Sequence, residues 1–121
     1  VQTTESDLKT LINGGYVGVY YDFNKSTPTA DSTGNIDFIL TYLRNNPSAN
    51  IEITGYADEI GSTSYNNTLS NARANNVKET LVKANVDASR LTIVGAGEDT
   101  SVNKDSDAAR SLVRKVTFKI K

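Results

Sequence analysis

Hydrophobic and polar positions change period several times along the chain, and each change predicts a new element. Strand-like segments, which alternate or are rich in Val, Ile and Tyr, cover residues 16–23, 51–55, 91–94 and 116–120. Helical spacing of hydrophobic residues covers residues 29–45 and 63–84, and a short helix is expected over 107–113. Residues 1–15 are interpreted as a linker or a short N-terminal helix, since the pattern of 5–13 suits both.

This order of elements predicts one α+β domain over residues 16–121. Written as βαβαβ(α)β, it implies a mixed four-stranded sheet with its two main helices packed on one face. The run Gly95-Ala96-Gly97 is expected to end the third strand. A chain of 121 residues hides roughly two-thirds of its surface on folding, which is enough for a single core.

Composition excludes several classes of function. The chain has no His and no Cys, which removes Ser-His-Asp and Cys-His nucleophiles, thiol redox chemistry and zinc sites that need imidazole or thiolate. With 13 basic and 14 acidic residues the net charge is −1, and no basic stripe favours a nucleic-acid partner. No apolar run approaches the roughly 20 residues of a membrane span. We interpret a chain that begins at Val as an excerpt from a longer protein.

A metal site and an enzyme site are both weakly supported. The spacing Asn103-x-Asp105-x-Asp107 opens like a calcium loop, but Ala108 replaces the sixth-position Gly and Arg114 the twelfth-position Glu. Asp58 and Glu59 are adjacent, whereas glycan cleavage needs two carboxyl groups that flank the scissile bond. We therefore expect no metal, no cofactor and no catalysis.

The long helix carries one polar anomaly. Projection at 100° per residue places Arg73 and Asn66 on the apolar stripe formed by Leu69, Ala74 and Val77, among others. A guanidinium is costly to bury unpaired, so Arg73 is expected to meet a carboxylate or to reach solvent at the edge of the stripe. Together with Asn66 it could line one wall of a cleft.

The loop of residues 55–62, between the second strand and that helix, carries another candidate. Asp58 could face Arg73 across one opening, and the two charges would complement the ammonium and carboxylate of an amino acid. A turn or cap role suits Asp58 equally well.

At these residues the sequence resembles a known family, the OmpA-like C-terminal domain, a peptidoglycan-binding module that also occurs in the peptidoglycan-associated lipoprotein and in flagellar stator proteins. The resemblance covers about residues 17–121. It rests on four blocks in the family's order: Tyr21-Asp22-Phe23-Asn24-Lys25-Ser26; Gly55-Tyr56-Ala57-Asp58-x-x-Gly61; Asn66-x2-Leu69-Ser70-x2-Arg73-Ala74-x2-Val77-x3-Leu81; and Val86-Asp87-Ala88-Ser89-Arg90-Leu91 through Gly95-x-Gly97.

The resemblance implies non-covalent binding of peptidoglycan through the diaminopimelate of its stem peptide. By analogy Asp58 would take the diaminopimelate ammonium, Arg73 its carboxylate, and Asn66 would support the site. Further contacts are implied at Asp22, Asn24, Ala57, Arg114 and Lys115. The sequence departs from the family where Ala57 replaces Thr, Val113 replaces Asn and Lys115 replaces Arg, which turns a planar two-pronged donor into a point charge.

The resemblance also implies a location and partners. It places the chain in the periplasm, as a domain of an outer-membrane or envelope protein that is attached to the membrane only through a missing N-terminal region. A homodimer is compatible with it. The alternative is a structural or protein-interaction domain in which the changes at Val113 and Lys115 have weakened or abolished binding.

Overall fold

The computed structural model describes residues 5–121, which form four α-helices and four strands. The helices are α1 (Glu5–Asn13), α2 (Gly34–Asn45), α3 (Thr63–Lys83) and α4 (Asp107–Ser111). The strands are β1 (Val19–Tyr20), β2 (Ile51–Ala57), β3 (Leu91–Glu98) and β4 (Lys115–Ile120). None of the helices described is both long and apolar enough to span a bilayer.

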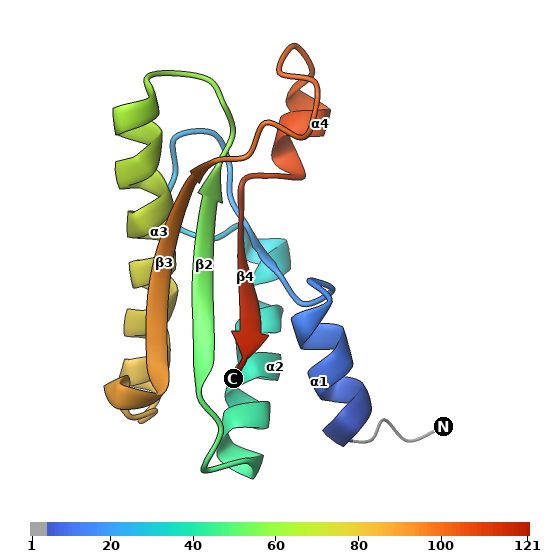
Figure 1. The fold of residues 1–121 in the computed structure, drawn as a ribbon, viewed down its shortest axis with the longest axis vertical. Helices are drawn as coiled ribbons and strands as arrows, with labels where there is room; N and C mark the ends of the chain where they lie inside the picture. The colour runs from blue at the N-terminus through green and yellow to red at the C-terminus, as the bar shows by residue number, and fades with distance from the viewer. Residues whose placement is uncertain (1–4) are drawn as a thin grey trace.

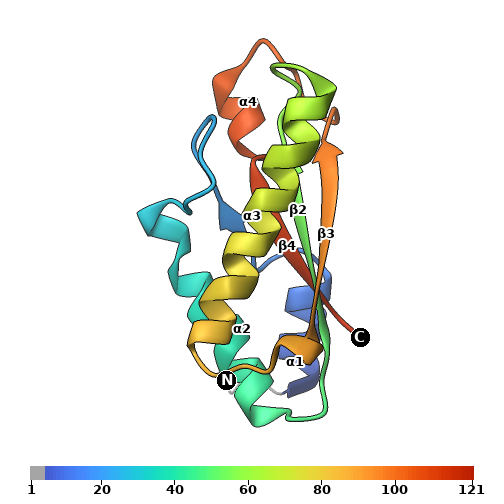
Figure 2. The ribbon, with the colours of Figure 1, turned by 90° about the vertical axis from the view of Figure 1, so that its left-hand side faces the viewer.

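The strands form one mixed sheet in the order β1-β4-β2-β3. β2 and β3 run parallel, with Ile51 opposite Leu91, whereas β4 is antiparallel to both β2 and β1. Helices α2 and α3 cover one face of the sheet, and the other face is left open (Figures 1 and 2). The predicted α+β class and the predicted layers are confirmed.

The core lies between the sheet and these two helices. Residues of β2 alternate between buried and half-buried, and Val116, Phe118 and Ile120 of β4 are buried, as their spacing predicts. Helix α1 lies beyond β4 in Figure 1. Its Ile12 is fully buried in the same core, and the Asn13 side chain accepts a 2.6 Å hydrogen bond from the Ile120 N–H.

Several predicted boundaries differ from the structure. The segment 16–23 contributes only a two-residue strand, followed by a single bridge between Tyr21 and Pro28. The predicted helix over 29–45 divides into a 3₁₀ turn at Ala30–Ser32 and α2.

The prediction that Gly95-Ala96-Gly97 ends the third strand is wrong, because β3 continues to Glu98. The glycines serve packing rather than chain reversal. A Cβ atom at Gly95 would lie 2.9 Å from the Asn71 Cβ, and one at Gly55 would lie 2.0 Å from the Ser70 carbonyl oxygen. Helix α3 therefore approaches β2 and β3 more closely than side chains would allow.

Candidate functional site

Asp58 is a buried carboxylate in the loop that follows β2. Its side chain is 4% exposed, and Oδ1 accepts a 3.0 Å bond from the Ile60 N–H, which closes a tight turn. Oδ2 instead faces cations, with Arg114 Nη1 at 3.2 Å and Arg110 Nε at 3.7 Å. One oxygen of Asp58 therefore fixes the turn, while the other faces Arg114 and Arg110, and no ion pair of the described residues joins Asp58 to Arg73.

Arg73 is fully buried, and its environment is neither of the two that its helix position predicted. It neither reaches solvent nor meets a carboxylate, since no ion pair of the described residues includes it. Its guanidinium donates to three backbone carbonyls, with Nε to Lys25 at 2.9 Å, Nη1 to Tyr56 at 2.8 Å and Nη2 to Asp22 at 3.3 Å. It also lies 5.0 Å from the centre of the Tyr21 ring.

This environment penalises the charge of Arg73 without removing it. Burial lowers the pKa of the guanidinium to about 10, and the nearby Tyr21 and Asp58 oppose that change. The group stays protonated at neutral pH. A guanidinium has five N–H bonds, so two of them have no partner among these three carbonyls.

Asn66, one of the predicted supports, is buried and ties the loop to the sheet. Its side-chain amide donates to the Ile60 carbonyl and to the Glu98 carboxylate, both at 3.0 Å. Ser62 caps the first turn of α3 by accepting from the Tyr65 N–H. These bonds hold residues 58–62 between α3 and the end of β3.

The loop after β1 brings two further predicted residues to the same end of the molecule. Asp22 has an exposed side chain and contacts Arg73 through its backbone carbonyl. Asn24 adopts a left-handed conformation with φ of 63°, and its side chain accepts a 2.9 Å bond from the Tyr65 hydroxyl. Arg73 and Tyr65 therefore fasten this loop to α3.

Arg114 lies directly before β4, three residues after the end of α4, and contacts Asp58. It donates Nε to the Tyr21 carbonyl at 3.0 Å and Nη1 to both Asp58 and Asp107, at 3.2 and 3.1 Å. Arg110 joins this cluster from α4, and its Nε is buried without a hydrogen bond. The sequence analysis did not predict Arg110 and considered Asp107 only as part of a calcium-loop spacing. Arg110 and Arg114 are four residues apart, a spacing that places both on one side of a helical turn.

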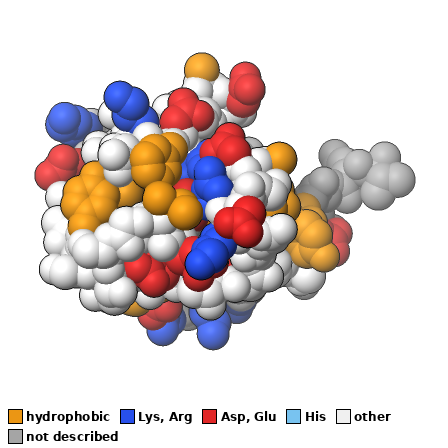
Figure 3. Space-filling view, turned by 90° about the horizontal axis from the view of Figure 1, so that it is seen from above, with side chains coloured by type: hydrophobic (Ala, Val, Ile, Leu, Met, Phe, Trp, Pro, Cys, Tyr) orange, Lys and Arg blue, Asp and Glu red, His pale blue; other side chains and the backbone are white. Residues whose placement is uncertain are grey.

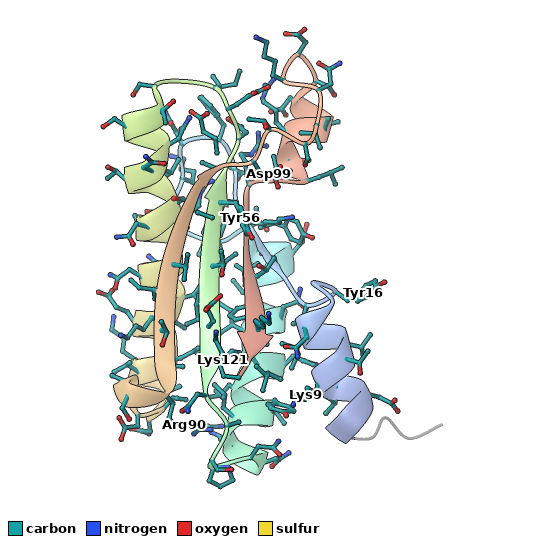
Figure 4. The ribbon with its side chains drawn as sticks, in the orientation of Figure 1. Lys9, Tyr16, Tyr56, Arg90, Asp99 and Lys121 are labelled. Carbon is teal, nitrogen blue, oxygen red and sulfur yellow. The ribbon has the colours of Figure 1, made fainter. Side chains whose placement is uncertain are left out.

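The remaining predicted residues lie apart from this cluster. Lys115 Nζ lies 4.0 Å from an Asp99 oxygen and 5.3 Å from the centre of the Tyr56 ring. Figure 4 shows Tyr56 and Asp99 near the same end of the sheet. Ala57 is buried, and its carbonyl accepts from the Asp99 N–H. Val113, which stands where the family has Asn, is also buried.

The site is a surface of opposed charges rather than a cavity. Arg73 and Asn66 are both buried, so they do not line the wall of an open cleft as predicted. Among the described residues no group of three His, Cys, Asp or Glu side chains could hold a metal ion. Figure 3 looks down on this end of the molecule and shows acidic and basic side chains intermingled beside a group of hydrophobic ones.

Comparisons with known proteins agree on one family. The family model described as "OmpA family" matches residues 20–114. Outer membrane porin F of Pseudomonas fluorescens is 38% identical over 99 residues, which cover 81% of this chain and 30% of the porin. The peptidoglycan-associated lipoprotein of Haemophilus influenzae is 36% identical over 84 residues, 69% of this chain and 55% of the lipoprotein.

Solved structures support the fold. The peptidoglycan-associated lipoprotein from Burkholderia pseudomallei superimposes with a TM-score of 0.79 at 24% identity, covering 86% of this chain and 89% of that one. The chain spans less than a third of the length of the porin and about half of the H. influenzae lipoprotein. The similarity thus concerns one domain of longer proteins.

Proposed function

Because this chain belongs to the OmpA family, we propose that it binds peptidoglycan non-covalently through the diaminopimelate of the stem peptide. No reaction is part of this role. The similarity to proteins named for the outer membrane and for peptidoglycan supports a periplasmic position in a Gram-negative envelope, where the domain would hold its parent protein to the wall.

The observation that carries the proposal is the unpaired charge of Arg73. A buried guanidinium held by carbonyls has its donors partly satisfied but its charge uncompensated. The Asp22 carbonyl makes the longest of its three bonds, at 3.3 Å. A ligand carboxylate that takes the place of this carbonyl would exchange a neutral acceptor for a charged one, which makes the bond stronger.

Asp58 would receive the ammonium of the same diaminopimelate. Its Oδ2 shares Arg114 with Asp107, so the carboxylate is held in place and is near enough to Arg73 to affect the guanidinium pKa. The end of the diaminopimelate side chain carries an ammonium and a carboxylate on one carbon, which matches an anion in the loop after β2 and a cation on α3.

The other residues would act mainly by position. Asn66 would hold the 58–62 loop, Arg114 would orient Asp58, and Asp22 and Asn24 would border the ligand from the opposite loop. Lys115 would have to leave Asp99 to take part.

Changing the ligand tests this proposal without disturbing the protein. We expect a stem peptide containing diaminopimelate to bind roughly 10- to 100-fold more tightly than the same peptide with lysine, because lysine lacks the carboxylate assigned to Arg73. Acetylation of the terminal amine of diaminopimelate should weaken binding similarly, by removing the charge assigned to Asp58. Isothermal titration calorimetry measures both.

Two outcomes would count against the proposal. Equal affinity for the diaminopimelate and lysine peptides would remove the role of Arg73. If the wild-type domain binds no stem peptide and stays in the supernatant when purified sacculi are sedimented, it does not bind peptidoglycan, and the protein-interaction alternative takes its place. Lys119→Gln removes an exposed positive charge at a position that the proposal does not use. This variant should bind the diaminopimelate peptide as tightly as the wild-type domain does.

A further inference from the structure

The carboxylate of Asp58 is buried, so a ligand ammonium cannot reach it unless a neighbouring group moves. Three groups contact it. The Ile60 N–H lies 3.0 Å from Oδ1, and Arg114 and Arg110 face Oδ2 at 3.2 and 3.7 Å. The structure therefore raises the question of which of these three groups makes room for the ligand.

Two of the three groups are held firmly. The side chain of Arg114 makes three hydrogen bonds, two of them to Asp58 and Asp107, and is 6% exposed. The Ile60 N–H belongs to a backbone turn that Asn66 fixes by donating to the Ile60 carbonyl. Movement of either group would break bonds that shape the site.

Arg110 is held less firmly. Its contact with Asp58 is an ion pair without a hydrogen bond, and the side chain is 18% exposed. Among residues 5–121 its Nε is the one buried side-chain nitrogen or oxygen that makes no hydrogen bond, which is a costly arrangement. Its helix, α4, has only five residues and lies at the end of the sheet where β2 ends (Figure 1).

Resting on the proposed function, we propose that Arg110 occupies the place of the ligand ammonium at Asp58 and is displaced when the ligand binds. Both cations would use Oδ2, since Oδ1 accepts the Ile60 N–H. A compact ammonium that approaches Oδ2 to hydrogen-bond distance makes a stronger contact than an ion pair at 3.7 Å. Arg110 therefore lowers the affinity for the ligand and favours ligands that bring a cation of their own.

Arg110 keeps other partners when it leaves Asp58. Its Nη1 donates to the Lys104 carbonyl, and its Nη2 donates to Asp107 Oδ1 at 3.4 Å. The Asp107 side chain is exposed, so it can follow the guanidinium toward solvent. Both partners belong to α4 or to the loop before it, so the displacement needs only a local movement.

The test measures the binding of two ligands by isothermal titration calorimetry: the diaminopimelate stem peptide and the same peptide acetylated at the terminal amine. We expect Arg110→Gln to bind the first peptide about three- to tenfold more tightly than the wild-type domain does, because the competing cation is gone. Its affinity for the acetylated peptide should stay within about twofold of the wild-type value. Loss of a merely structural residue would instead weaken the binding of both peptides.

Two variants serve as controls. Arg110→Lys keeps a positive charge beside Asp58, so it should lose most of the gain that Arg110→Gln shows. Arg44→Gln removes an arginine that bonds to the Ala84 carbonyl, at the end of α3 opposite to the site, and should change neither affinity.

The wild-type domain provides a measurement that does not depend on a variant. Addition of the diaminopimelate peptide should speed the exchange of the Arg110 Nε–H with water, because this group leaves a buried position. The Arg114 Nε–H, which donates to the Tyr21 carbonyl at 3.0 Å, should stay protected. NMR spectra of the arginine Nε–H groups measure both, and Arg110→Lys identifies the Arg110 signal by its loss.

The outcomes separate this inference from the proposed function. Unchanged or weaker binding of the diaminopimelate peptide by Arg110→Gln, an equal gain for the acetylated peptide, or unchanged exchange of the Arg110 Nε–H at saturation overturns the displacement of Arg110 while peptide binding stands. If the wild-type domain binds neither peptide, the proposed function fails and this inference fails with it.

Discussion

Arg73 stabilises the fold and is also proposed to bind the ligand, so substitutions at this position affect both properties. Its guanidinium connects α3 to two other segments. It donates to the Tyr56 carbonyl near the end of β2 and to the Asp22 and Lys25 carbonyls in the loop of residues 22–25. The same group supplies the charge that the proposed ligand needs. Removal of the side chain therefore affects folding and binding together, and loss of binding in such a variant does not by itself identify a contact.

We expect Arg73→Met to lower the free energy of unfolding by roughly 3–5 kcal/mol, because it removes three hydrogen bonds that a buried side chain donates to backbone carbonyls. Arg73→Lys should lose less, since one ammonium can serve part of that set. Urea denaturation measures both. Arg44→Met is the control: this exposed arginine makes one 3.3 Å bond to the Ala84 carbonyl, so its loss should change stability by less than about 0.5 kcal/mol. Wild-type stability of Arg73→Met would show that these bonds do not stabilise the fold.

At the scale of elements, the packing of α3 on the sheet depends on positions that lack a side chain. The pattern of the sequence predicts both elements correctly, but it assigns Gly95 and Gly97 to a strand end because glycine is common in turns. Only the distance between helix and strand shows that glycine is required for close approach, and that distance is a property of two segments distant in sequence.

Gly55→Ala should destabilise the protein by about 2–4 kcal/mol or prevent folding, because the new Cβ would lie 2.0 Å from a carbonyl oxygen of the α3 backbone, which cannot move alone. Gly34→Ala is the control, at the start of α2 with nothing within 4 Å of the added Cβ. It should be neutral or stabilising by up to about 1 kcal/mol. Thermal unfolding compares the two. Similar melting temperatures for both variants would contradict the close approach of α3.

Across the whole molecule, the structure brings several of the predicted site residues to one end of the sheet, but through contacts that the sequence did not predict. Asp58, Asn66 and the loop of residues 22–25 meet because they follow strands or begin the helix at one end of the sheet, which topology predicts. The contact of Arg114 with Asp58 depends on the way α4 folds back over 56 residues of separation. No local pattern contains that information: the four-residue spacing of Arg110 and Arg114 indicates that they share one side of a helical turn, but not that this side faces Asp58.

Helix α1 lies at the N-terminal end of the domain, and its contacts bear on whether it unfolds together with the sheet. Sequence patterns could not separate a linker from a helix here, since a linker needs no core contact and the hydrophobic spacing is short. In the structure Ile12 is fully buried in the main core, whereas its neighbour Leu11 is 39% exposed. Asn13 adds the bond to the Ile120 N–H at the end of β4.

We therefore expect Ile12→Ala to lower the free energy of unfolding of the whole domain by about 2–5 kcal/mol, as for other fully buried residues, and Leu11→Ala by less than about 1 kcal/mol. If α1 belongs to the cooperative unit, amide exchange should quicken in Ile12→Ala throughout the sheet, including at Ile120, to a degree that matches the global loss. If α1 instead unfolds on its own, exchange will quicken in α1 and at Ile120 alone while β2 and β3 keep their protection, and the domain boundary will lie after residue 15.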